Sequence, residues 1–129
     1  MKKLSADDKS KAKDDPSLAR LLDLDGEIME VGGGCWVALR VKRVPASAAK
    51  PHGIDYSLAL IGPRDERLVC YDNAHPVKAG RAAGRKKPKA GDHRHIRDRV
   101  RPYAYSDAET LMRDFWADVE RVLKEEGMP

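Results

Sequence analysis

Long hydrophobic runs are missing from this sequence of 129 residues. No stretch reaches the roughly 18 apolar residues that a membrane-spanning helix needs. The chain is charged from Lys2 onward and lacks the apolar segment of a signal peptide, so we expect a cytoplasmic protein that does not enter a membrane. The two cysteines, Cys35 and Cys70, should therefore be reduced, buried thiols rather than a disulfide.

Aromatic side chains are scarce as well, at 5% of residues, whereas charged residues make up 36%. A chain of this length has room for one domain, and this composition predicts one compact core with highly charged loops. The net charge of +4 is unevenly spread, because residues 75–102 alone carry +8 and the remainder is negative. Such a basic segment favours a phosphate-bearing partner, with nucleic acid as the first candidate.

Two regions have too little apolar surface to pack into a core. Residues 1–16 are almost entirely charged or small, and we expect a disordered leader there. Residues 74–91 are rich in glycine, proline and lysine, which predicts an exposed and mobile basic loop. The rest of the chain, residues 17–129, is expected to form a single α+β domain that carries this loop.

Alternation of apolar and polar residues indicates most of the β-strands. The turn signal Asp25-Gly26 predicts a tight hairpin, in which residues 18–24 pair with a returning strand at 27–31. Further strands are expected at 35–42, 54–61, 66–72 and 93–100. The core-facing positions of the strand at 35–42 are Cys35, Val37, Leu39 and Val41.

The clearest helix lies near the C-terminus. Ser106 and Glu109 form a capping box with Ser106 as the N-cap, and Gly127 is a natural stop. The apolar stripe at helical spacing consists of Leu111, Met112, Phe115, Val119, Val122 and Leu123. These patterns together predict an α+β fold, in which an antiparallel β-sheet of about five strands has one long C-terminal amphipathic helix packed on one face.

Four side chains on these elements have simple structural interpretations. Trp36 and Phe115 are expected in the core rather than on a ligand-binding surface. Asp114 and Asp118 lie four residues apart on the helix, where a solvated acidic surface is the expected environment.

His93 and His95 form the strongest candidate site. Alternate residues of an extended chain point to the same face, so the two imidazoles should lie side by side with Arg94 on the opposite face. Such a pair can divide acid and base roles near neutral pH, or it can share a metal ion. It can also simply hold a turn by hydrogen bonds, and the sequence leaves this structural alternative open.

Four motifs run along the chain in a fixed order. They are HG-x-x-Y at 52–56, YDN at 71–73, GDH-x-H at 91–95 and L-x-x-DF-x-x-D at 111–118. This series resembles the TumE family of small bacterial toxins, and the resemblance covers about residues 18–126. It implies a toxin that is neutralised by a helix-turn-helix antitoxin. The sequence departs from the family's pattern in the insertion at 74–90 and in the charged leader.

The resemblance also implies an activity, because small bacterial toxins are often metal-independent endoribonucleases. RNA cleavage needs a base for the 2′-hydroxyl, an acid for the leaving 5′-oxygen and cations for the phosphate. In this interpretation His93 and His95 are the acid–base pair, Asp72 orients a histidine, and His52 and Tyr56 position the substrate. The cations that would contact phosphate are Arg94, Arg97, Arg85, Lys86, Lys87 and Lys89.

Other interpretations stay open. Asp72, Asp92, His93 and His95 offer ligands to a metal, but the many nearby cations oppose a second positive centre, so we expect neither a metal nor another cofactor. A non-catalytic module whose basic face binds nucleic acid or a protein is the main alternative to an enzyme. His52 alone more simply shapes the entry to the following strand. A homodimer is compatible with the sequence.

Overall fold

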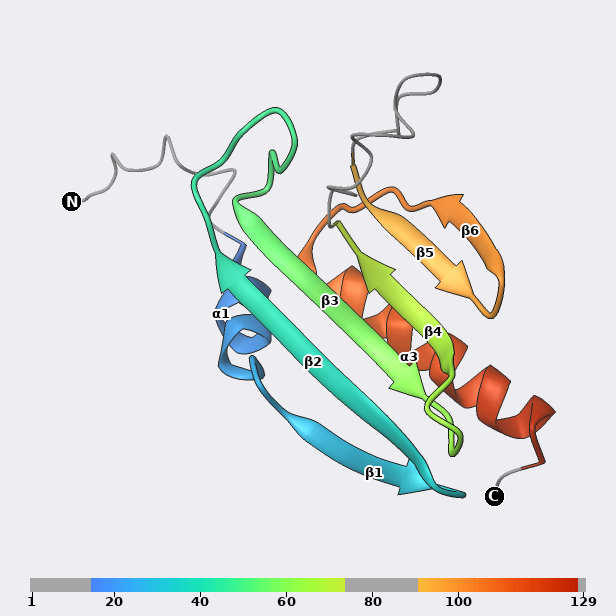
Figure 1. Ribbon diagram of the computed structural model, residues 1–129. Helices are drawn as coiled ribbons and strands as arrows, with labels where there is room; N and C mark the ends of the chain where they lie inside the picture. The colour runs from blue at the N-terminus through green and yellow to red at the C-terminus, as the bar shows by residue number, and fades with distance from the viewer. Residues whose placement is uncertain (1–14, 74–90, 128–129) are drawn as a thin grey trace.

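The computed structural model describes residues 15–73 and 91–127, which form six β-strands and two α-helices. The strands are β1 (Ile28–Gly32), β2 (Cys35–Arg43), β3 (Ile54–Ile61), β4 (Arg67–Asp72), β5 (His93–Ile96) and β6 (Arg99–Pro102). They pair in this order in one antiparallel sheet. The helices α1 (Pro16–Asp23) and α3 (Ala108–Glu125) both lie behind the sheet in Figure 1. The predicted α+β fold is therefore confirmed.

Two predictions concern residues that the structure does not describe. The disordered leader at 1–16 and the mobile basic loop at 74–91 fall almost entirely outside the described ranges. Within those ranges, neither helix combines the length and the apolar character that crossing a membrane requires.

The strand predicted at residues 18–24 is wrong, because residues 18–23 belong to α1 and Leu24 is its C-cap. Leu18 and Leu21 are the buried residues of the helix, and their spacing of three fits one helical face rather than strand alternation. The Asp25-Gly26 turn therefore joins a helix to β1 instead of closing a hairpin. Residues 28–32 nevertheless form the strand expected after that turn.

Asp15 links the N-termini of the two helices. One of its carboxylate oxygens accepts a hydrogen bond from the Ser17 N–H (3.1 Å) in α1, and the other accepts one from the Ala108 N–H (2.8 Å) in α3. The N-cap of α3 is Asp107 rather than the predicted Ser106, which misplaced the cap by one residue. Two aspartates thus satisfy amide groups at the helix ends that would otherwise lack partners.

Two short strands, β5 and β6, replace the single strand predicted at 93–100, so the sheet has six strands rather than about five. Arg97 and Asp98 form the turn between them, and Arg97 has a φ of 54°, where hairpins usually place glycine or asparagine. The Arg97 N–H donates to the Leu68 carbonyl (2.9 Å), and its guanidinium pairs with two glutamates at the end of α3. The sequence has no glycine, asparagine or proline at this turn to predict it. Contacts with Leu68 and α3 hold it instead.

The hydrophobic core lies between the sheet and the helices. The predicted core positions of β2 are all buried, and so is Phe115 on α3. The alternate residues of β3 that join them are Ile54, Tyr56, Leu58 and Leu60. Trp36 lies on the other side of β2 and is 44% exposed, so its predicted place in the core is wrong. Strand alternation turns it away from the helices.

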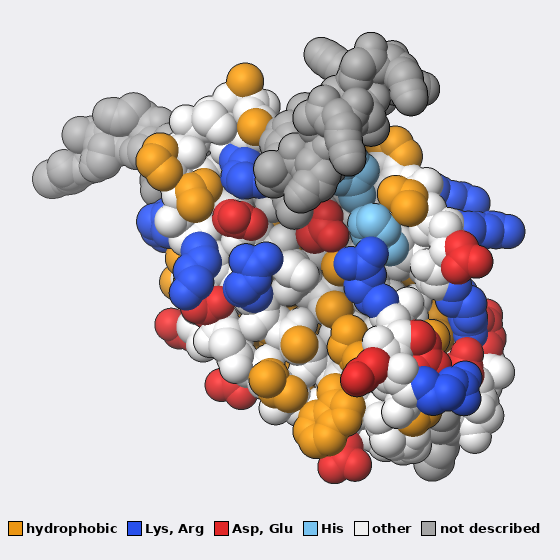
Figure 2. All heavy atoms as spheres, in the orientation of Figure 1, with side chains coloured by type: hydrophobic (Ala, Val, Ile, Leu, Met, Phe, Trp, Pro, Cys, Tyr) orange, Lys and Arg blue, Asp and Glu red, His pale blue; other side chains and the backbone are white. Residues whose placement is uncertain are grey.

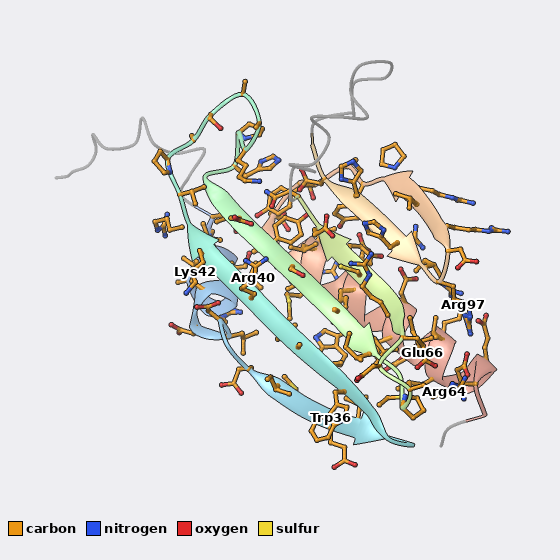
Figure 3. All side chains as sticks on the ribbon, in the orientation of Figure 1. Trp36, Arg40, Lys42, Arg64, Glu66 and Arg97 are labelled. Atoms are coloured by element: carbon orange, nitrogen blue, oxygen red, sulfur yellow. The ribbon has the colours of Figure 1, made fainter. Side chains whose placement is uncertain are left out.

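The opposite face of the sheet is covered by no helix or strand within the described ranges (Figure 1). Figure 3 shows Trp36, Arg40 and Lys42 following one another along β2 on this side. We call this surface the open face. Strand alternation and register assign to it Ile28, Trp36, Ala38, Arg40, Ser57, Ala59, Cys70, Asp72, His93, His95 and Val100.

Candidate functional site

Strands β4 and β5 bring three of the predicted site residues together on the open face. Their register pairs Asp72 with His93 and Cys70 with His95. Tyr71 lies between Cys70 and Asp72 and points the other way, since its hydroxyl donates a hydrogen bond to a carboxylate of α3. The two histidines therefore lie side by side on the face away from the helices, as the alternation along the strand predicted.

Asp72 is the polar centre of this group. Its Oδ2 atom lies 3.4 Å from Nε2 of His95 and accepts a hydrogen bond from the Cys70 thiol (3.3 Å). Burial, with Asp72 as the second cause, raises the pKa of Cys70 to about 12. The thiol therefore stays protonated at neutral pH and is a poor nucleophile. Cys70 helps to hold the carboxylate that faces His95.

His95 is set up to be neutral at physiological pH. Burial lowers its pKa below the ordinary value of 6.5, and this effect exceeds the opposing effect of Asp72, while Arg67 and His93 lower the pKa further. The ring centroids of His93 and His95 are 6.4 Å apart. A reacting group between the rings could come within hydrogen-bond reach of both. The pair can thus supply a base and an acid to one substrate.

Tyr56 and His52, which were also predicted in the site, occupy different surroundings. Tyr56 is fully buried on the helix side of the sheet, and its hydroxyl donates to Asp92 (2.6 Å). Burial, followed by the contact with Asp92, raises the pKa of Tyr56 far above its ordinary value, so this hydroxyl stays protonated. His52 stacks on Tyr105 with ring centroids 4.1 Å apart. Among the described residues, no polar contact joins either side chain to the two histidines.

The four residues that were considered as metal ligands do not all lie on the same side of the sheet. Asp92 is occupied by Tyr56 on the helix side of the sheet, whereas Asp72 faces His95 on the open face. Within residues 15–73 and 91–127, no three His, Cys, Asp or Glu side chains come together in a way that could hold a metal ion.

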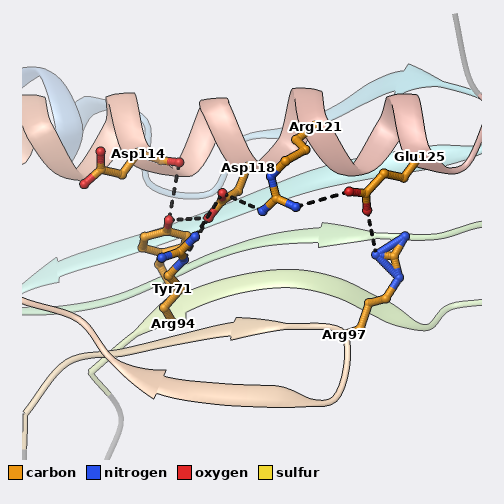
Figure 4. A network of polar contacts seen from close by, with 7 residues as sticks. All are labelled: Tyr71, Arg94, Arg97, Asp114, Asp118, Arg121 and Glu125. Atoms are coloured by element: carbon orange, nitrogen blue, oxygen red, sulfur yellow. Dashed lines mark hydrogen bonds and ion pairs between the residues drawn. The ribbon is translucent and has the colours of Figure 1, made fainter.

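Arg94 and Arg97 reach toward α3, as Figure 4 shows. The Arg94 guanidinium contacts the Asp118 carboxylate with Nε and Nη2 at 3.0 and 3.2 Å. Arg97 pairs with Glu125 (3.4 Å) and Glu126 (2.7 Å). The two predicted phosphate-binding cations are therefore on the opposite side of β5 from His93 and His95.

Asp118 is a residue whose importance the sequence interpretation missed. It is only 6% exposed and accepts hydrogen bonds from Tyr71, Arg94 and Arg121, so the predicted solvated environment is wrong for it. Burial tends to raise its pKa, but these three donors together hold the pKa below its ordinary value. The signal was its spacing, because Asp118 lies three residues after Phe115 and thus on the buried side of the helix.

The cations on the open face are not those that were predicted to contact phosphate. Arg40 is paired with Ser57 and Ser57 with Asp72, so Arg40 lies in the same cross-strand row as the carboxylate. Arg67 is close enough to His95 to affect its pKa. Figure 2 shows the histidine side chains reaching the surface on this face, with Lys or Arg side chains nearby. The predicted phosphate contacts outside the described residues are Arg85, Lys86, Lys87 and Lys89.

Comparison with known proteins supplies one match. The model of the family described as "Toxin TumE" matches residues 18–123, which include all six strands and most of α3. Searches of curated proteins and of solved structures gave no significant match.

Proposed function

Because this chain belongs to the TumE toxin family, we propose that it is the toxin of a toxin–antitoxin pair and that it cleaves RNA on the open face of its sheet. The observation that carries this proposal is the contact between His95 and Asp72 at 3.4 Å, beside the second imidazole of His93. An oriented, neutral histidine next to another histidine is suited to acid–base chemistry without a metal ion.

The proposed reaction is an internal transesterification. With Asp72 facing Nε2, the Nδ1 atom of His95 takes the proton from the ribose 2′-hydroxyl, and the 2′-oxygen attacks the adjacent phosphorus. The bond from phosphorus to the 5′-oxygen breaks, and His93 gives a proton to that oxygen. The products are a 2′,3′-cyclic phosphate and a 5′-hydroxyl. Arg40 and Arg67 supply positive charge on the same face for the developing negative charge.

A substrate that lacks the nucleophile tests this function. We expect the purified protein to cleave single-stranded RNA in the presence of a chelator and to leave a cyclic phosphate. A single 2′-deoxy substitution at the cleaved position should abolish cleavage there. Product analysis by mass spectrometry measures both results. Cleavage that survives this substitution, or that stops when the chelator is added, would contradict the proposed chemistry.

The pH dependence of cleavage tests the role of His95 as base. Its pKa is lowered, so the acidic limb of the kcat/KM profile should lie below pH 6.5. Asp72→Asn removes a charge that raises this pKa, so the limb should move to lower pH. Arg67→Gln removes a charge that lowers it, so the limb should move to higher pH. If both variants keep the limb of the unmodified protein, His95 is not the base.

Several wider assignments follow from this function. The partner would be a helix-turn-helix antitoxin, and the target RNA would place the toxin in the cytoplasm. The basic segment that includes Arg85, Lys86, Lys87 and Lys89 would add contacts to phosphate. Residues 17–129 would act as a single domain.

A second candidate function is a non-catalytic binding module. The three large hydrophobic side chains most exposed in the described chain, Ile28 (66%), Val100 (56%) and Trp36 (44%), all lie on the open face. An exposed apolar surface next to cations suits a protein partner. Binding to the antitoxin without any RNA cleavage would favour this function over the first.

A further inference from the structure

A groove of about 570 Å³ lies on the helix side of the sheet, between the β5–β6 hairpin and α3. Five arginines line it, namely Arg94, Arg97, Arg99, Arg101 and Arg121. The acidic residues in its lining are Asp98 and Glu125, so the groove carries a net positive charge. We call it the arginine groove. It is separated from the histidine pair only by the β5–β6 ribbon.

Two of these arginines are available to a ligand. Arg94, Arg97 and Arg121 are already paired with carboxylates of α3 or its C-terminal end, as Figure 4 shows for several of these contacts. Arg99 and Arg101 on β6 are exposed and make no ion pair within the described ranges. As alternate residues of one strand they share a face, with backbone positions roughly 6.6 Å apart. This spacing suits successive phosphates of an extended polynucleotide.

We propose that the arginine groove binds phosphate groups of the same RNA strand whose cleaved bond lies at His93 and His95. The inference rests on the proposed function and adds a second, separate contact region. Val100 is paired with His95 on the open face, while its neighbours Arg99 and Arg101 point to the groove. Because β6 is the edge of the sheet, a strand of RNA that crosses Val100 can contact both faces, and β6 lies only about 5 Å from β5, which carries the histidines.

The chemistry favours phosphate over an added protein strand. A guanidinium forms paired hydrogen bonds with phosphate oxygens, and Arg99 and Arg101, which make no ion pair within the described ranges, offer this geometry twice. The edge itself is a poor template for strand addition, because β6 has only four residues and ends in Pro102, which has no N–H. The edge at β6 is therefore better suited to an RNA strand that crosses it than to a β-strand that would pair with it.

Binding of an RNA that cannot be cleaved tests this inference apart from catalysis. The probe is a fluorescent polyuridine oligonucleotide with 2′-O-methyl groups, and its affinity for the full chain is measured against salt concentration. Arg99→Gln/Arg101→Gln should reduce the slope of log affinity against log salt by up to about 1.4, since each phosphate contact on a single strand contributes roughly 0.7. The matched control, Arg20→Gln/Arg113→Gln, removes the same charge from exposed positions on α1 and α3 and should leave the slope unchanged.

Three results are distinguishable. If the slope of log affinity against log salt falls only in Arg99→Gln/Arg101→Gln (the β6 variant), the inference is supported. This holds even if no RNA is ever cleaved and the proposed function fails. Equal slopes in both variants and the unmodified protein overturn it, even if cleavage is demonstrated. Loss of antitoxin binding in the β6 variant with unchanged RNA affinity also overturns it, and assigns the groove to an acidic surface of the protein partner.

Discussion

Replacing both His93 and His95 by alanine is expected to eliminate measurable RNA cleavage, and replacing His95 alone should reduce kcat/KM by roughly 10²–10⁴-fold, the usual contribution of acid–base catalysis. The physical reason is that His95 faces Asp72 at 3.4 Å and has a lowered pKa, so its removal takes away the neutral base. Cleavage of a short fluorescent RNA, and growth inhibition on expression, measure the effect.

The same variants should fold normally, because both side chains are only partly buried on the open face and lie outside the helix-side core. Melting curves followed by circular dichroism should therefore stay close to those of the unmodified chain. External imidazole should restore part of the activity of His95→Ala by supplying the missing base. Undiminished cleavage by the double variant would remove the histidines from the mechanism. A large drop in melting temperature would instead show that they hold the fold.

Truncating Phe115 to alanine is expected to have the largest effect on stability, at roughly 3–5 kcal/mol. Phe115 is fully buried, and its ring meets those of Tyr71 and Trp116 edge-on, at centroid distances of 5.9 and 5.5 Å. A domain of this size has about 5–15 kcal/mol of total stability, so the variant should be largely unfolded under mild denaturing conditions. Urea denaturation measures the change in the free energy of unfolding.

Trp36→Ala is the matched control for this prediction. It also removes a large aromatic side chain, but from a 44% exposed position on the open face. Its effect on the free energy of unfolding should be small, near the roughly 0.5 kcal/mol typical of surface substitutions. Similar losses in the two variants would contradict the assignment of the core to the helix side of the sheet.

Local periodicity was sufficient to predict β2, β3, β4 and α3, because an alternating or helical pattern of apolar residues directly reflects which side of an element is buried. It failed where two patterns were compatible with the same residues. The segment 18–24 contains several leucines, and its helix is decided by the cap at Asp15 and by packing against β2 and α3. The turn at Arg97 failed for another reason, since contacts from Leu68 and α3 hold a conformation that arginine does not favour by itself.

In the site, too, local patterns predicted some features and long-range contacts decided others. Alternation along one strand placed His93 and His95 together and Arg94 on the other side, and the structure has them so. The comparison of motifs predicted that Asp72 orients a histidine, but which histidine it contacts depends on the register between β4 and β5, which brings Asp72 within 3.4 Å of His95. Tyr56 was predicted near the histidines, but a contact between distant parts of the chain pairs its hydroxyl with Asp92 instead. No spacing along the chain contains this information.

The sequence by itself therefore determined the family, the α+β class and the shared face of the two histidines, because each follows from residues close together or from motifs read in order. The tertiary structure alone decided how the strands are aligned across the open face, and so which residue contacts His95. It also decided that Tyr71, Arg94 and Arg121 are the residues that donate hydrogen bonds to the Asp118 carboxylate. The physical reason is that strand register and helix placement depend on how the whole core packs, and these set the distances between side chains that are far apart in the chain.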